Sequence, residues 1–207
     1  MNKSRGRVSS SPALRALAAL GRAGLARSRE LEGAGLTRAQ IRRLTSRGQL
    51  ERVGRGLYRR PGAPVTQHHD LALSAYLVPR GVICLLSALR FHGLTTQNPF
   101  EVWLAIDRKS WRPRVAHPPL RFVTMSTSYS RKDLERHLVE GVEVRVFSAA
   151  KTVADCFRYR NKLGLDVALE ALRAYRAKFP GGMDALWRCA RSGRVARVLQ
   201  PYLDALA

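Results

Sequence analysis

The chain has 207 residues, 45% of them hydrophobic, which is enough for one small and one medium-sized domain with separate cores. Its 37 lysines and arginines against 15 acids give a formal net charge of +22, which predicts a polyanionic partner such as nucleic acid. Because no apolar run approaches the length of a membrane span, and because Arg15 and Arg22 interrupt the apolar stretch near the start, we expect neither a membrane anchor nor an export signal.

The positive charge is concentrated near the start of the chain. Residues 1–60 hold 15 lysines and arginines against 3 acids, a net charge of +12 in under a third of the length. Residues 61–207 hold 22 against 12, a net charge of +10. We therefore expect the first segment to form the main contact with a polyanion.

Two helices are predicted before residue 37. Pro12–Leu20 has helical spacing, and four of its apolar residues are expected to face inward: Leu14, Leu17, Ala18 and Leu20. Ser28 can cap a second, short helix that runs through Glu32. Gly33–Leu36 then supplies a short turn of the kind that joins the two helices of a helix-turn-helix.

A third helix is predicted to begin at Arg38. Thr37 and Gln40 have the spacing of a capping box, in which each side chain hydrogen-bonds the backbone of the other residue. Ile41 and Leu44 fall on one face of this helix, whereas the rest of its circumference is mostly arginine. Gly48 is expected to end the helix.

A short hairpin is predicted directly after the third helix. Its strand-forming residues are Leu50, Val53, Leu57 and Tyr58. They are interrupted by Gly54–Gly56, whose glycines permit the positive φ angles of a tight turn. Arg55 is therefore expected at the tip of the hairpin.

The order of two helices, a turn, a cationic helix and a cationic hairpin is typical of a winged helix-turn-helix that binds DNA. The alternative is a solvated helix face beside an ordinary hairpin. We expect base reading by the early part of the third helix, phosphate contacts from the hairpin and its flanks, and insertion of Arg55 into the minor groove. The predicted DNA-binding residues are Thr37, Arg38, Gln40, Arg42, Arg43, Ser46, Arg47, Arg52, Arg55, Arg59 and Arg60.

A proline- and glycine-rich break at residues 61–64 indicates a domain boundary. Beyond it, three segments have strand character: Glu101–Ile106, Leu120–Met125 and Val142–Phe147. The predicted helices are His69–Val78, Val82–His92, Ser148–Arg160, Leu165–Phe179, Met183–Ser192 and Val195–Leu206. The sequence therefore predicts an α+β protein with a winged helix-turn-helix domain at residues 1–62 and a second domain at residues 63–207, in which helices pack on a small antiparallel or mixed sheet.

The cysteines and histidines do not form a metal-binding pattern. Cys84, Cys156 and Cys189 are widely spaced in apolar surroundings, which favours reduced thiols in the core of a cytoplasmic protein. His68 and His69 are adjacent without a further ligand pair at the spacing of a zinc site, so we interpret them as the polar start of a helix. We expect no metal and no cofactor.

Three segments resemble a known family. Residues 49–58, together with Leu36–Arg38, resemble the N-terminal winged-helix module of AbiEi-type antitoxins of bacterial type IV toxin-antitoxin systems. Residues 87–94 resemble the segment that follows the linker in that family, and residues 147–160 resemble a block of its C-terminal domain. Taken together, the resemblance spans residues 10–200 approximately.

The resemblance implies a transcriptional autorepressor that binds inverted repeats in its own promoter, with a homodimer as one possible form on the DNA. It also implies an antitoxin that counteracts a nucleotidyltransferase-like toxin in phage defence, whether or not the two proteins bind each other directly. A regulator without a toxin is an alternative within the same family. The protein would act in the cytoplasm and would not be an enzyme.

Two further interpretations remain open. Asp107–Lys109, with Glu143 and Arg145, faintly resembles the acidic and basic residues of a Mg²⁺-dependent nuclease. Arg145 stands where such a site usually has a lysine, and a simple ion pair between Glu143 and Arg145 is an adequate explanation. A basic protein-interaction module is the other class. Four residues of a predicted helix are spaced so that they share one face: Lys151, Asp155, Arg158 and Tyr159. This face is either a charged surface ladder or a contact face for a toxin or nucleic acid.

Overall fold

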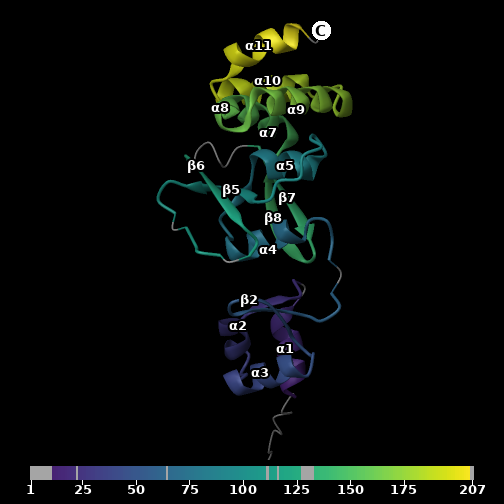
Figure 1. Cartoon of the computed structure of the whole chain (residues 1–207), viewed down its shortest axis with the longest axis vertical. Helices are drawn as coiled ribbons and strands as arrows, with labels where there is room; N and C mark the ends of the chain where they lie inside the picture. Colours follow the sequence, from purple (N-terminus) through teal and green to yellow (C-terminus); the bar gives the residue numbers. More distant parts are fainter. Residues whose placement is uncertain are drawn as a thin grey trace, which may run out of the picture. The chain divides into compact units, whose positions relative to one another are not determined.

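The computed structural model describes residues 11–21, 23–63, 65–110, 112–115, 117–126 and 133–205. The chain divides into two compact units, Met1–Thr66 and Gln67–Ala207 (Figure 1). The boundary after Thr66 lies slightly beyond the predicted break at residues 61–64, of which Pro64 is outside the described residues. Both units combine helices with a small sheet, so the predicted α+β class is confirmed.

The described residues of the N-terminal unit form three helices and a three-stranded antiparallel sheet. The helices are α1 (Pro12–Leu20), α2 (Ser28–Gly33) and α3 (Arg38–Ser46). The strands are β1 (Leu25–Arg27), β2 (Glu51–Gly54) and β3 (Leu57–Arg59), in the order β1-β3-β2. Strand β1 was not predicted, because three residues are too few to show a period of two.

The inward face of α1 agrees with the prediction at Leu20 but differs from it at Leu14, Leu17 and Ala18. Ala16 and Leu20 are buried, whereas Leu14 and Leu17 are 58% and 40% exposed and Ala18 is exposed too. The helix has two apolar stripes, and the one with the smaller side chains packs into the core, where α1 approaches α2 and β1. Its composition alone could not indicate which stripe would be buried.

The start of α2 also differs from the prediction. Ser28 is the first residue of the helix and Arg27 occupies the capping position, where its N–H donates to Glu30 Oε2 at 2.7 Å. The N–H of Ser28 donates instead to the carbonyl oxygen of Gly56 at 2.9 Å. This bond connects α2 to the turn of the hairpin formed by β2 and β3.

The C-terminal unit is built on a five-stranded mixed sheet in the order β6-β5-β4-β8-β7. Its strands are β4 (Val82–Ile83), β5 (Val102–Asp107), β6 (Leu120–Met125), β7 (Leu134–Val139) and β8 (Val142–Phe147). The described helices are α4 (His69–Leu77), α5 (Leu85–His92), α7 (Ala149–Arg158), α8 (Arg160–Leu163), α9 (Leu165–Lys178), α10 (Met183–Ser192) and α11 (Ala196–Asp204).

The predicted helix at Val82–His92 is partly wrong. Val82 and Ile83 form β4, and the helix begins only at Leu85. The two residues fill the centre of the sheet, where β4 pairs antiparallel with β5 and parallel with β8. This pairing satisfies their backbone groups better than a first helical turn would, because four N–H groups at a helix start lack partners.

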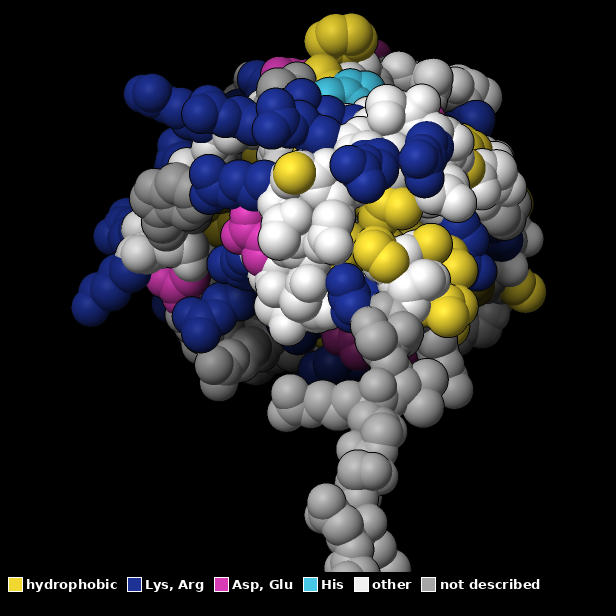
Figure 2. Space-filling view, turned by 90° about the horizontal axis from the view of Figure 1, so that it is seen from below, with side chains coloured by type: hydrophobic (Ala, Val, Ile, Leu, Met, Phe, Trp, Pro, Cys, Tyr) yellow, Lys and Arg dark blue, Asp and Glu magenta, His cyan; other side chains and the backbone are white. Residues whose placement is uncertain are grey.

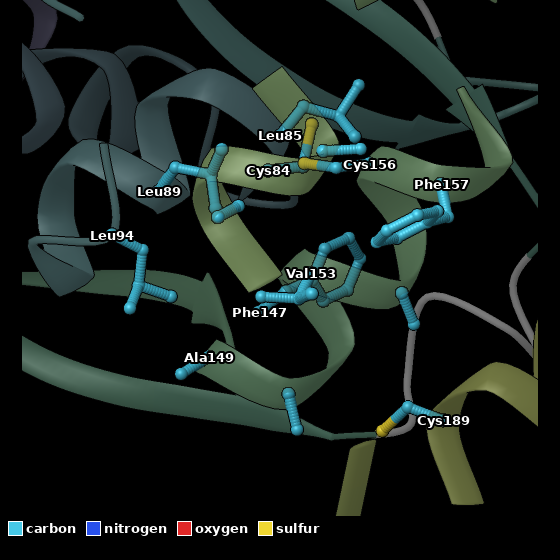
Figure 3. Packing of buried hydrophobic residues seen from close by; sticks show 14 of the residues in the cluster. Cys84, Leu85, Leu89, Leu94, Phe147, Ala149, Val153, Cys156, Phe157 and Cys189 are labelled. Carbon is cyan, nitrogen blue, oxygen red and sulfur yellow. The ribbon is translucent and has the colours of Figure 1, made fainter. Parts of the chain in front are cut away.

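Helices lie on both sides of this sheet. Helix α4 packs against β8, whereas α7 contacts α5, α9, α10 and α11 (Figure 1). The core on the α7 side contains Phe147, Val153 and Phe157, together with all three cysteines (Figure 3). Cys84, Cys156 and Cys189 are buried and free of disulfides, as expected for core thiols. Burial raises the pKa of each thiol, that of Cys189 to about 12.

Candidate nucleic-acid interface

Helix α3 begins with the predicted capping box. The N–H of Gln40 donates to Thr37 Oγ1 at 3.2 Å, and the N–H of Thr37 donates to Gln40 Oε1 at 2.9 Å. Ile41 and Leu44 are buried in the core of the N-terminal unit. The helix is therefore fixed at its start and along one side, which leaves the opposite side exposed to solvent.

The exposed side of α3 carries cations and small residues: Arg38, Ala39, Arg42, Arg43 and Ser46. Arg38 Nε donates to Glu32 Oε1 of α2 at 3.0 Å. Ser46 Oγ donates to the carbonyl oxygen of Arg43 at 3.0 Å. Arg42 and Arg43, by contrast, have no carboxylate partner among the described residues.

The predicted hairpin is formed by β2 and β3. Arg52 pairs with Tyr58 and Gly54 with Leu57, so Arg55 and Gly56 form the turn and Arg55 is exposed at its tip. Gly56 has the positive φ of 68° that favours glycine, whereas Gly54 does not. The structure therefore needs only one of the two glycines for its backbone conformation.

Two of the hairpin arginines contact groups of their own unit. The guanidinium of Arg59 donates to both carboxylate oxygens of Glu51, at 2.7 and 2.8 Å. Arg52 Nε donates to the carbonyl oxygen of Gly54 at 3.1 Å. Because Arg59 already neutralises a carboxylate, it offers less net charge to a phosphate than an arginine without such a partner.

Six predicted arginines are exposed and have no carboxylate partner in the part of the chain that the structure describes: Arg42, Arg43, Arg47, Arg52, Arg55 and Arg60. They come from α3, its C-terminal end and the hairpin. Figure 2, in which side chains of both units are visible, shows many more basic than acidic side chains, with some hydrophobic side chains among them. The exposed arginines of α3 and the hairpin can bind a polyanion through phosphate contacts.

The predicted charged face on α7 is not a surface ladder. Lys151 and Asp155 are 2% and 0% exposed, and Lys151 Nζ donates to Asp155 Oδ2 at 3.0 Å. The ammonium also lies 4.3 Å from the centre of the Phe147 ring. Burial lowers the pKa of Lys151, although Asp155 opposes this effect. Neither residue can contact a partner, because both are inside the core.

Two residues of the predicted α7 face do reach the surface. Arg158 is exposed and Tyr159 is partly buried, and the guanidinium carbon of Arg158 lies 5.9 Å from the centre of the Tyr159 ring. Lys162 Nζ lies at the same distance from that ring. Burial raises the pKa of Tyr159, so its phenol stays protonated at neutral pH.

The acidic residues considered for a nuclease site are held by local contacts. Glu143 Oε1 accepts from Arg136 at 2.8 Å and from Arg145 at 3.4 Å, as expected for an ion pair on one strand face. Asp107 Oδ1 accepts from the N–H of Lys109, and its strand is separated from that of Glu143 by β4. The described residues contain no group of three or more histidines, cysteines or acids that could hold a metal ion.

The comparisons with known proteins concern the N-terminal unit. Residues 12–61, which run from α1 to just after β3, match a family described as transcriptional regulator, AbiEi antitoxin. The resemblance stated from the sequence is thereby confirmed over these residues. No curated protein matches the chain. Among the described residues, no helix is both long and apolar enough to cross a membrane.

Proposed function

We propose that the N-terminal unit is a winged helix-turn-helix that binds duplex DNA, with α3 as the recognition helix and the β2–β3 hairpin as the wing. The observation that carries this proposal is the group of exposed arginines without carboxylate partners on α3 and on the hairpin that follows it. The family match over residues 12–61 supports it, because that family consists of transcriptional regulators and antitoxins.

We further propose that the chain is an autorepressor and antitoxin of a type IV toxin-antitoxin system. Residues 1–62 would bind inverted repeats in its own promoter, two copies acting together because one winged helix covers a single half-site. Residues 63–207 would counteract a nucleotidyltransferase-like toxin. Since autorepression requires access to the chromosome, this function places the protein in the bacterial cytoplasm.

The predicted DNA contacts divide by geometry. Arg42 and Arg43, on the exposed side of α3, are the best placed to reach base edges in the major groove. Arg47 and Arg60 would bind phosphates, and Arg55 would enter the minor groove from the tip of the wing. Arg38 and Gln40 have a weaker case as base readers, because one pairs with Glu32 and the other closes the capping box.

The direct test is binding of the full-length protein to its own promoter fragment. We expect the logarithm of the affinity to fall linearly with the logarithm of the salt concentration, and the promoter to be preferred over random duplex DNA at every salt concentration. A chain that binds neither duplex, or that binds both without salt dependence, would contradict the proposal. Incubation of the protein with the same duplexes and Mg²⁺ tests the nuclease alternative. A nuclease would nick the DNA under these conditions.

Antitoxin activity needs a separate test. If a nucleotidyltransferase-like gene adjoins this one, its expression alone should arrest growth, and co-expression of the full chain should restore it. A chain that represses its promoter but has no such neighbour would be a regulator without a toxin. That outcome would leave the DNA-binding proposal intact and remove only the antitoxin role.

A further inference from the structure

The centre of the exposed side of α3 is occupied by small side chains. At 3.6 residues per turn, Ala39 and Ser46 are seven residues apart and lie on nearly the same line along the helix. This line is opposite the buried Ile41 and Leu44. Arg42 lies on one side of it and Arg43 on the other, so the two guanidinium groups flank a low strip of surface.

Apart from Arg42 and Arg43, the polar side chains near this strip are hydrogen-bonded within the unit. Arg38 donates to Glu32, and the Gln40 side chain accepts from the Thr37 N–H. Ser46 donates its hydroxyl hydrogen to the carbonyl oxygen of Arg43. The methyl group of Ala39, which is exposed in the first turn of α3, is therefore the apolar centre of a cationic face.

An exposed methyl group gains free energy by contact with another apolar group, and the thymine C5-methyl is the apolar group that base pairs present in the major groove. We propose that Ala39 is a specificity-determining residue that contacts a thymine methyl group, in register with bases or phosphates contacted by Arg42 and Arg43. This inference rests on the proposed function, because it requires α3 to lie in the major groove. The small side chain also lets the helix backbone approach the base edges closely.

The test begins with selection of preferred sequences from a random duplex DNA library by the full-length protein. Each thymine of the selected duplex is then replaced by deoxyuridine, which removes the methyl group and leaves base pairing unchanged. We expect one position in each half-site at which this replacement weakens binding about fourfold, the value of one buried methyl-sized group. The other thymines should tolerate it.

The Ala39→Gly variant links that position to this residue. It should bind the thymine duplex about as weakly as the unmodified protein binds the deoxyuridine duplex, and it should no longer distinguish the two. Ala39→Ser is a second variant in which a polar group replaces the apolar contact without a glycine in the helix. Ala18→Gly is the matched control, since Ala18 is an exposed alanine of α1, and it should retain the full sensitivity to deoxyuridine.

The outcomes separate the two proposals. A protein that selects no sequence from the library contradicts sequence-specific DNA binding and this inference together. A selected duplex in which every thymine tolerates deoxyuridine overturns the inference alone. The same holds if Ala39→Gly and Ala39→Ser retain the unmodified protein's sensitivity at the critical position, because another residue would then contact the methyl group.

Discussion

Arginines that are equivalent in the sequence differ in what they contact. Arg59 holds both oxygens of Glu51, whereas Arg42 is exposed on α3 without a carboxylate partner among the described residues. A guanidinium that already pairs with a carboxylate has fewer free donors for DNA. The contribution of each arginine to DNA binding should therefore follow its pairing rather than its position in the sequence.

The first prediction compares these two arginines. Arg42→Ala should weaken binding to the preferred duplex by about 1 to 3 kcal/mol and relax the preference at one base pair. Arg59→Ala should have a smaller effect, equal on preferred and random DNA, because its pair with Glu51 is mainly structural. Titration of both variants against the preferred duplex and its single-base-pair changes is the measurement. Equal losses of affinity for both variants on every duplex would contradict the different roles predicted for Arg42 and Arg59.

Burial also decides the role of charged residues in the C-terminal unit. Lys151 and Asp155 have the spacing of a surface ion pair on a helix, yet both side chains are inside the core. Removal of one partner would leave an uncompensated charge or polar group there, whereas removal of both can be almost neutral. The pair is therefore a determinant of how α7 packs.

The second prediction concerns this ion pair. Lys151→Met and Asp155→Leu should each lower the free energy of unfolding by about 3 to 5 kcal/mol, and the double variant should lose much less than the sum. All three tryptophans belong to the C-terminal unit, so urea unfolding followed by tryptophan fluorescence reports on this unit. Additive losses would mean that the two residues do not stabilise each other.

Among the elements, helices with a cap or a clear period were predictable, and strands without an alternating pattern were not. The boundaries of α1 and α10 agree with the sequence analysis, and the capping box of α3 is confirmed. Strands β4 and β7 were missed. Strand β4 has only two residues, and β7 is rich in charged residues, so neither has the alternation of a half-buried strand.

Strand β7 is defined by its partner and by a turn. It pairs antiparallel with β8, and the connecting residues Glu140 and Gly141 both have positive φ angles, of 50° and 77°. Two such residues form the tight turn that suits the twist of a hairpin. The pair Glu140-Gly141, directly before the valine-rich strand β8, could have indicated a hairpin turn and therefore a strand before it.

The third prediction tests the connection between the β2–β3 hairpin and α2. Gly56→Ala would place a Cβ 3.2 Å from Ser28 Oγ at a φ of 68°, and should destabilise the N-terminal unit by about 1 to 2 kcal/mol. Hydrogen exchange of the amides of α2 and β3 is the measurement. Gly33→Ala is the control, because its Cβ would meet no atom within 4 Å and its φ is not positive, and it should not speed exchange. Similar exchange in both variants would show that the turn tolerates a side chain.

At the scale of the whole molecule, the division into two units suggests that the two proposed activities are separable. The N-terminal unit contains the exposed arginines of α3 and the hairpin, and the family match ends at residue 61. The C-terminal unit has its own sheet and its own core around α7. Each unit therefore has the means to fold around its own apolar residues.

The fourth prediction follows from this division. Arg42→Ala combined with Arg43→Ala should abolish repression and spare antitoxicity when the protein is expressed from an independent promoter. Truncation after Thr66 should abolish antitoxicity. It should also abolish cooperative binding to an inverted repeat, while the truncated protein still binds a single half-site. Promoter activity and growth rescue are measured in the same cells. Variants in which both outputs always fall together would show that the activities are not separable by unit.

The sequence by itself determined the features that depend on neighbouring residues. These are the capping box at Thr37, the hairpin with Arg55 at its tip, the α+β class and the excess of positive charge in the first 60 residues. Local backbone preferences and formal charge are carried by the residues themselves, so no knowledge of the fold is needed to recognise them.

The tertiary structure decided which side chains meet and which remain exposed. It buried Lys151 with Asp155, joined Arg59 to Glu51, and selected the Ala16 stripe of α1 over the Leu14 stripe. It also assembled β1, β4 and β7 from segments without a clear strand pattern. Burial and strand pairing depend on partners that are distant in the sequence, and a local pattern contains no information about those partners.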